Sequence, residues 1–203
     1  MCQAKGRSEK SKLVKNLLDT LGAKSSETKD HALRMARLAV ELGEKLELPN
    51  DDLNKLNLLA ILHDIGKATI SEEILTKSGK LSDEEWEIIK EHPAKGKAIA
   101  AASEEFLPIA KYILHHHESY DGSGYPDGLA GDEIPLLSRI ISIIDAYDVM
   151  THSRSYNKVK SREEAVEEIR ECAGTQFDPY LAENFIEMIN KEDDFKPQDN
   201  SVI

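Results

Sequence analysis

Residues 63–67, His-Asp-Ile-Gly-Lys, carry side chains that could bind a metal ion and the phosphate that the ion activates. They follow an apolar run ending at Leu62, and they place the His63 imidazole beside the Asp64 carboxylate. Both groups are ligands for first-row transition metals, and the adjacent lysine offers a cation to a phosphate oxygen. Alternatively, His63 and Asp64 form the polar end of a core helix, with Gly66 as its C-terminal cap. The local sequence favours neither interpretation.

Other ligand types occur on the preceding helix. Ser25 or Ser26 can cap a helix that runs to about Leu46, and its buried face is predicted to hold His31 together with Met35, Leu38 and Leu42. Glu27 lies one turn before His31, so both side chains could bind one ion. The alternative is a first-turn acid and a core histidine, which these two residues alone favour.

Four more histidines lie near expected helix ends. His92 precedes Pro93, which disfavours a helical conformation before it, so His92 is expected at a break between two helices, free to reach a shared cavity or only to cap a helix. His115, His116 and His117 are consecutive and cannot share one helix face. At least one of these three is therefore expected to be spare.

A strongly apolar helix is predicted after Pro135, and it carries Asp145 and Asp148 near its end. Carboxylates three residues apart lie on one face, and burying even one is costly without a cation. This is the strongest evidence for a metal from any one helix. Arg154 and Lys158 follow and could contact a phosphate, although two exposed cations after a helix usually serve only solubility.

Two further stretches predict structure rather than chemistry. Ser82 precedes Glu85 by three residues as in a capping box, and the Trp86, Ile88 and Ile89 that follow are expected in the core. The polar, glycine-rich stretch 119–133 is long for a loop within a compact domain and predicts a structured wall or docking surface, with a mobile linker as the alternative.

Length and composition limit the number of domains and the classes of partner that the chain can bind. The chain has 203 residues, enough for one substantial core, and 26 basic against 38 acidic residues give a formal charge of -12. This balance argues against binding a nucleic-acid polymer or an acidic membrane surface. The two cysteines, Cys2 and Cys172, suggest neither a disulfide framework nor a thiolate zinc site. No apolar run reaches membrane-spanning length, so a cytoplasmic location is expected.

Taken together, these residues form one set of imidazoles and carboxylates without thiolate. Five of the chain's seven histidines belong to it, too many ligands for a single tetrahedral site, so at least two ions are expected. Two divalent cations would outweigh three ionised carboxylates by one positive charge and let this acidic protein accept a phosphodiester. The candidate ligands are Glu27, His31, His63, Asp64, His92, His116, His117 and Asp145.

The ordered motifs resemble the HD-GYP domain, the branch of the HD phosphohydrolase superfamily that hydrolyses bacterial cyclic di-GMP. The resemblance covers nearly the whole chain, and its ordered set of motifs is far more specific than any one of them. One departure is the segment 152–156, His-Ser-Arg-Ser-Tyr, where Ser-Asp-Arg-Pro-Tyr is commoner. The matching motifs are residues 63–67, Glu91-His92-Pro93, His115-His116-His117-Glu118, Asp121-Gly122-Ser123-Gly124-Tyr125-Pro126, Asp145-Ala146-Tyr147-Asp148 and Gly174-Thr175-Gln176-Phe177-Asp178-Pro179.

The resemblance implies an all-α fold, a single HD-type domain of about seven to eight helices. The glycine-rich stretch 119–133 is then its GYP loop. Residues 1–24 would be a lead or linker helix, 25–190 the catalytic domain and 191–203 a polar tail. By the same likeness, Asp64 bridges two ions, Glu27 accompanies a third metal in some members, and the remaining candidate ligands complete the cluster.

The resemblance also implies an activity. A metal-bridging hydroxide would hydrolyse cyclic di-GMP to pGpG, and then to GMP in some cases, with Asp64 and Lys67 catalytic and iron or manganese as the metal. Lys67, Arg154, Lys158 and Tyr125 would contact the substrate. Alternatives are another cyclic dinucleotide or nucleotide substrate, or a signalling interaction module with structural metals whose GYP loop binds a partner such as a diguanylate cyclase. Homodimer formation is left open.

Overall fold

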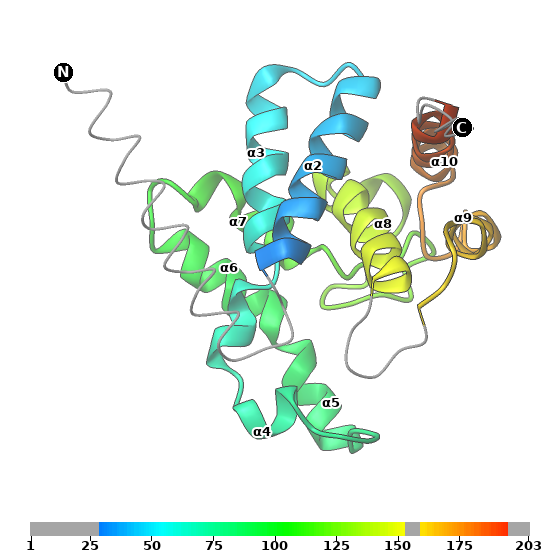
Figure 1. Ribbon diagram of the computed structural model, residues 1–203. Helices are drawn as coiled ribbons and strands as arrows, with labels where there is room; N and C mark the ends of the chain where they lie inside the picture. The colour runs from blue at the N-terminus through cyan, green and yellow to red at the C-terminus, as the bar shows by residue number, and fades with distance from the viewer. Residues whose placement is uncertain (1–28, 153–158, 195–203) are drawn as a thin grey trace, which may run out of the picture.

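The computed structural model describes residues 29–152 and 159–194 (Figure 1). Glu27, Arg154 and Lys158 lie outside these ranges, as does the predicted lead segment 1–24.

Within the described ranges every regular element is a helix, and the only extended pairing is an isolated bridge between Ala173 and Phe177. The predicted all-α class is confirmed. The α-helices are α2 (Lys29–Lys45), α3 (Asn50–Leu62), α4 (Glu72–Leu75), α5 (Asp83–Lys90), α6 (His92–Ala101), α7 (Ala110–Leu114), α8 (Leu136–Thr151), α9 (Arg162–Glu171) and α10 (Pro179–Asp194). Three short 3-10 helices accompany them over the same ranges: η1 (Ile65–Thr69), η2 (Leu107–Ile109) and η3 (Gly131–Glu133).

The core lies where α2, α3 and α8 pack side by side (Figure 1). Leu56, Leu59 and Leu62 of α3 are buried, and so is the inward face of α2. Helix α8 contributes Ile140, Ile141, Ile143 and Ile144, none of which is exposed to solvent. Truncating one such side chain to alanine typically costs about 2–5 kcal/mol. This rigid packing holds the polar ends of the three helices in fixed positions.

Gly66 has a different role from the predicted helix cap. Helix α3 ends at Leu62, and Gly66 lies inside η1, which packs directly on α6. A Cβ atom placed on Gly66 would lie 1.9 Å from the carbonyl oxygen of His92 and 2.7 Å from the backbone nitrogen of Gly96. The glycine is therefore required because two backbones meet there.

The predicted burial of Trp86 and Ile88 is wrong. Their relative exposures are 46% and 38%. The Ser82–Glu85 capping box is present, so the helix start was predicted correctly. However, α5 has only eight residues and lies with α4 at one end of the molecule (Figure 1). Among the described helices, no larger one covers both Trp86 and Ile88 there.

At the C-terminal end, α9 begins with a second capping box, between Ser161 and Glu164. Helix α10 continues to Asp194, past residue 190, where the family resemblance placed the end of the catalytic domain. Among the described residues, none of the helices has the length and apolarity needed to cross a bilayer.

Candidate metal centre

Three buried histidines are each held by one ring nitrogen. His63 Nδ1 lies 3.0 Å from the Ala60 carbonyl, His92 Nδ1 lies 2.8 Å from the Ile89 carbonyl, and His116 Nδ1 lies 2.6 Å from the Ile113 carbonyl. In each case the acceptor is three residues earlier, at the end of a helix or beside it. A carbonyl can only accept, so Nδ1 carries the proton and Nε2 of the neutral ring presents a lone pair. This arrangement suits a metal ligand.

His31 is held in the same way by a carboxylate. Its Nδ1 lies 2.6 Å from Asp148 Oδ2, while its Nε2 lies 3.6 Å from Asp145 Oδ1. Asp145 and Asp148 therefore serve different purposes although they share a helix face. Asp145 faces the histidine cluster, and Asp148 binds the ring nitrogen of His31 that points away from the cluster.

Sequence reasoning missed the partner that compensates the buried Asp148. Both carboxylate oxygens of this 1% exposed residue accept hydrogen bonds from the Arg34 guanidinium, at 2.6 and 2.8 Å. Burial opposes ionisation, but the hydrogen bonds from Arg34 and His31 outweigh it and hold the pKa of Asp148 well below its usual range. Arginine neutralises this carboxylate, so its burial alone is not evidence for a metal.

The predicted ligands converge as two groups of atoms. Asp64, His92, His116 and His117 offer ligand atoms within 4.8 Å of one another, and His31, His63 and Asp145 do the same. The ring centroids of His63 and His116, one from each group, are 5.3 Å apart. Seven of the eight predicted ligands thus meet in space, and Glu27 lies outside the described residues.

Asp64 lies between the two groups. Its Oδ1 is 2.9 Å from His92 Nε2, whereas its Oδ2 is 3.3 Å from His63 Nε2 and 2.5 Å from Lys67 Nζ. Burial raises the pKa of this carboxyl, but its neighbours, above all the Lys67 ammonium group, overcome that effect, so the net pKa falls well below the ordinary value. Asp64 is an ionised carboxylate with one oxygen directed to each group.

The remaining imidazoles are kept neutral by their surroundings. Burial lowers the pKa of His116, and burial is also the main reason why the pKa of His117 lies well below the ordinary value. Neutral imidazole is the form that binds a metal.

The GYP loop contacts this cluster through Tyr125 and is structured, as predicted. The Tyr125 ring stacks on His117, with centroids 5.0 Å apart and planes inclined by 27°, and Tyr125 N donates to the His117 carbonyl. Burial raises the pKa of the Tyr125 phenol, so it stays protonated. Bonds from Tyr120 N and Asp121 N to the carbonyls of Gln176 and Thr175 tie the loop to the 174–179 segment.

His115 is the spare histidine. Its Nε2 lies 3.0 Å from Asp127 Oδ2 on the GYP loop rather than in either group of ligand atoms. Glu118 is only 3% exposed, and its Oε1 accepts a hydrogen bond from Asp127 N at 2.8 Å. These two residues brace the loop.

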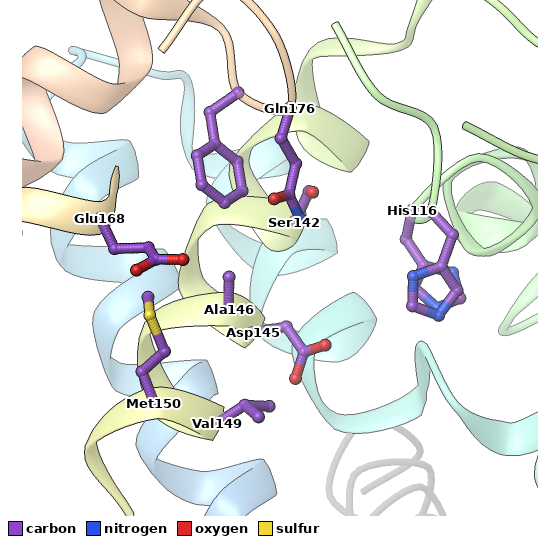
Figure 2. Close-up of a pocket in the computed structure, with 10 residues that line it drawn as sticks. His116, Ser142, Asp145, Ala146, Val149, Met150, Glu168 and Gln176 are labelled. Carbon is purple, nitrogen blue, oxygen red and sulfur yellow. The ribbon is translucent and has the colours of Figure 1, made fainter. Parts of the chain in front are cut away.

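A cavity of about 330 Å³ opens beside the cluster (Figure 2). His116 lies at one end of it, and the lining also includes His117 and residues from α8, among them Asp145, from α9 and from the 174–179 segment. This volume lies at the lower end of the range for small-molecule sites.

The donor set fits divalent transition metals. Asp64 Oδ1 is buried and receives no hydrogen bond of acceptable geometry from the described residues, although His92 Nε2 lies 2.9 Å away. A metal ion bound by both atoms would satisfy this buried carboxylate oxygen and the imidazole nitrogen together. Imidazole and carboxylate without thiolate suit iron, manganese or zinc.

Comparison with known proteins identifies the family of this chain. The HD domain family matches residues 12–181. The chain belongs to the HD domain family. This match and the relatives described next confirm the resemblance to HD-GYP domains, and HD-domain phosphodiesterases are metal-dependent enzymes.

Among the relatives of this HD domain, a cyclic di-GMP phosphodiesterase of Pseudomonas aeruginosa is 35% identical over 176 residues, 85% of this chain and 42% of the relative. A 3'3'-cGAMP-specific phosphodiesterase of Vibrio cholerae is 37% identical over 183 residues, 89% of this chain and 35% of the relative. The chain thus spans less than half the length of these relatives. The HD domain of the phosphodiesterase PgpH from L. monocytogenes, solved with cyclic-di-AMP, has the same fold, with a TM-score of 0.61, 19% identity and coverage of 90% of this chain and 99% of that one.

Proposed function

We propose that this HD domain is a metal-dependent phosphodiesterase that hydrolyses cyclic di-GMP to pGpG, and further to GMP. The observation that carries the proposal is the position of Asp64, with one oxygen directed to each of two groups of ligand atoms. Relatives named as cyclic di-GMP phosphodiesterases support the choice of substrate.

The proposed ligands are His92, His116 and His117 for one ion and His31, His63 and Asp145 for the other, with Asp64 shared. Metal ions held there would activate water as a nucleophile and neutralise charge on the phosphorane-like transition state. Glu27 is proposed to accompany a third ion. Iron or manganese is the proposed native metal, because both accept mixed imidazole and carboxylate ligation.

The protein's own groups position and neutralise the substrate. Lys67 Nζ lies 2.5 Å from Asp64 in the cluster. Its positive charge acts to lower the pKa of both His117 and Tyr125, so it lies close to both side chains. A phosphate entering the site would compete with Asp64 for this ammonium group, which would then bind a non-bridging phosphate oxygen. The Tyr125 phenol remains a hydrogen-bond donor because its pKa is raised. Arg154 and Lys158 are proposed as further phosphate contacts.

The test is turnover by anaerobically purified protein loaded with iron or with manganese. Conversion of cyclic di-GMP to pGpG by either form is expected, and intact substrate with both metals would refute the proposal. A matched His115→Gln protein should retain activity, because His115 binds the loop and not the cluster.

A second candidate substrate is 3'3'-cGAMP, because a relative specific for it is 37% identical to this chain. Competition between the two cyclic dinucleotides for the same metal-loaded protein separates them: the preferred substrate has the higher kcat/KM.

An interaction role for the GYP loop stays a prediction. Tyr125 is half-buried against His117, so its ring has only part of its surface available for a partner protein. A pull-down with a diguanylate cyclase that is unaffected by Tyr125→Ala would remove the loop from such an interaction.

A further inference from the structure

The cavity beside the metal centre has the layout of a pocket for a flat ring. Its floor is a stripe of α8 containing Ser142, Asp145, Ala146, Val149 and Met150, which recur at helical spacing. These residues span about 12 Å along the helix axis at 1.5 Å per residue. Ser142 and Asp145 make the first part of the stripe polar, and Ala146, Val149 and Met150 make the rest of it apolar. An apolar floor with polar groups at its edges is how proteins hold heterocycles.

The end of the cavity far from the ligands carries a charged pair. In Figure 2, Glu168 and His116 lie at opposite ends of the cavity, with Asp145 and Ala146 between them. Lys160 Nζ lies 2.5 Å from Glu168 Oε2. The Lys160 backbone N–H donates to the carbonyl of Met150, a residue of the floor, at 2.9 Å, which fixes Lys160 beside the cavity.

This pair adds little to the stability of the fold. The Lys160 and Glu168 side chains are 39% and 47% exposed, and surface ion pairs this exposed contribute little to stability. Their exposure leaves both charged groups open to solvent, with Glu168 in the cavity lining and Lys160 paired to it.

We propose that Lys160 and Glu168 read the edge of a guanine base lying on the α8 floor; this inference rests on the proposed function, because the cavity adjoins the predicted reaction centre. Guanine presents the O6 acceptor beside the N1–H and N2–H₂ donors, whereas adenine presents an amino donor at the position of O6 and an acceptor at N1. An ammonium group beside a carboxylate presents a donor beside an acceptor. This order is complementary to guanine and opposed to adenine.

The consequence is selectivity among cyclic dinucleotides. A substrate with at least one guanine can place that base against Glu168 while its phosphate lies at the ligand cluster. A substrate with adenine only would bring the N1 lone pair towards the carboxylate and offer it no hydrogen-bond donor from the ring edge, which costs affinity.

The test is equilibrium binding of GMP, IMP and AMP to the metal-loaded protein by calorimetry, because the three share a phosphate and ribose and differ only in the base. The expected affinity order is GMP, then IMP, which lacks the N2 amino group, then AMP. Glu168→Gln should lower the affinity for GMP roughly tenfold or more and reduce the ratio of the GMP affinity to the AMP affinity. Lys160→Met should lower the affinities for GMP and IMP more than the affinity for AMP.

Glu167→Gln is the matched control. It makes the same charge change one residue earlier on α9, and Glu167 pairs with Arg170 away from the cavity lining. Its order of affinities should be that of the unmodified protein.

Equal affinity for GMP and AMP in the unmodified protein would overturn the inference, as would equal weakening of both nucleotides by Glu168→Gln. A separate assay with bis(p-nitrophenyl) phosphate, which has no base, reports on phosphodiester hydrolysis by the unmodified protein. A GMP preference that depends on Glu168, in a protein that hydrolyses neither this diester nor cyclic di-GMP, would support the base pocket and refute the proposed function.

Discussion

Replacing Gly66 with alanine should displace η1 from α6 and open the metal centre. The new Cβ would lie 1.9 Å from the His92 carbonyl oxygen and 2.8 Å from the His92 carbonyl carbon, both of them backbone atoms that cannot rotate away. A tight but acceptable contact needs roughly 3.4 Å, so the two segments must separate by about 1.5 Å. Asp64 and Lys67 lie on one side of this contact and His92 on the other.

Two quantities should change together in Gly66→Ala. Overpacking typically costs about 1–3 kcal/mol, which corresponds to a fall in Tm of roughly 2–12 °C for a chain of this size. The separation of Asp64 from His92 should also lower the bound metal, because ligand distances must hold within about 0.2 Å. Calorimetry gives the first quantity and elemental analysis the second.

Gly79→Ala is the control for Gly66→Ala. Gly79 has a φ of 123°, and a Cβ at this position would have nothing within 4 Å, so its substitution strains the backbone without touching the centre. It should lower Tm and keep the metal. Unchanged Tm and full metal content in Gly66→Ala would refute the reasoning about the close approach of η1 and α6.

Three further variants test other parts of the site. Lys67→Met should keep the metal and lower kcat for cyclic di-GMP about 100-fold or more, because a fixed cation beside the phosphate is lost; a kcat within a few-fold would contradict this role. Asp148→Asn should destabilise the protein by about 2 kcal/mol at neutral pH, since it removes the buried partner of the partly exposed Arg34. Because the pKa of Asp148 is lowered on folding, its contribution is present above about pH 4 and fades as the pH falls towards its folded pKa, so denaturation of both proteins from pH 7 to pH 3 should show a shrinking difference. His115→Gln should leave the metal content unchanged, because its Nε2 contacts Asp127 on the loop, and loss of an ion from this variant would place His115 in the cluster.

The positions of the ligands were predictable because helical periodicity carries the necessary information. A buried face containing His31, and apolar runs leading into His63 and Asp145, place the polar side chains at the inner ends of packed helices. The three consecutive histidines could not share a face, and one of them does lie apart.

The parts that the sequence did not predict depend on contacts between distant segments. Residues three apart on a helix point about 60° away from each other, which is enough for Asp148 to meet Arg34 on α2 while Asp145 faces the cluster. Gly66 looked like a cap because the backbone of α6, which requires the glycine, is some 26 residues later in the chain. Trp86 and Ile88 fit a core pattern, yet no helix of the described ranges covers that face of α5 fully.

The metal content of Asp64→Ala tests the central claim most directly, measured by elemental analysis of anaerobically purified protein beside the unmodified chain. If Asp64 joins two ions, the unmodified protein should hold at least two per chain and the variant should lose them together with turnover, because no neighbouring group of the described cluster can supply a second bridging carboxylate. An Asp64→Ala protein that retains its full complement of metal would contradict the account.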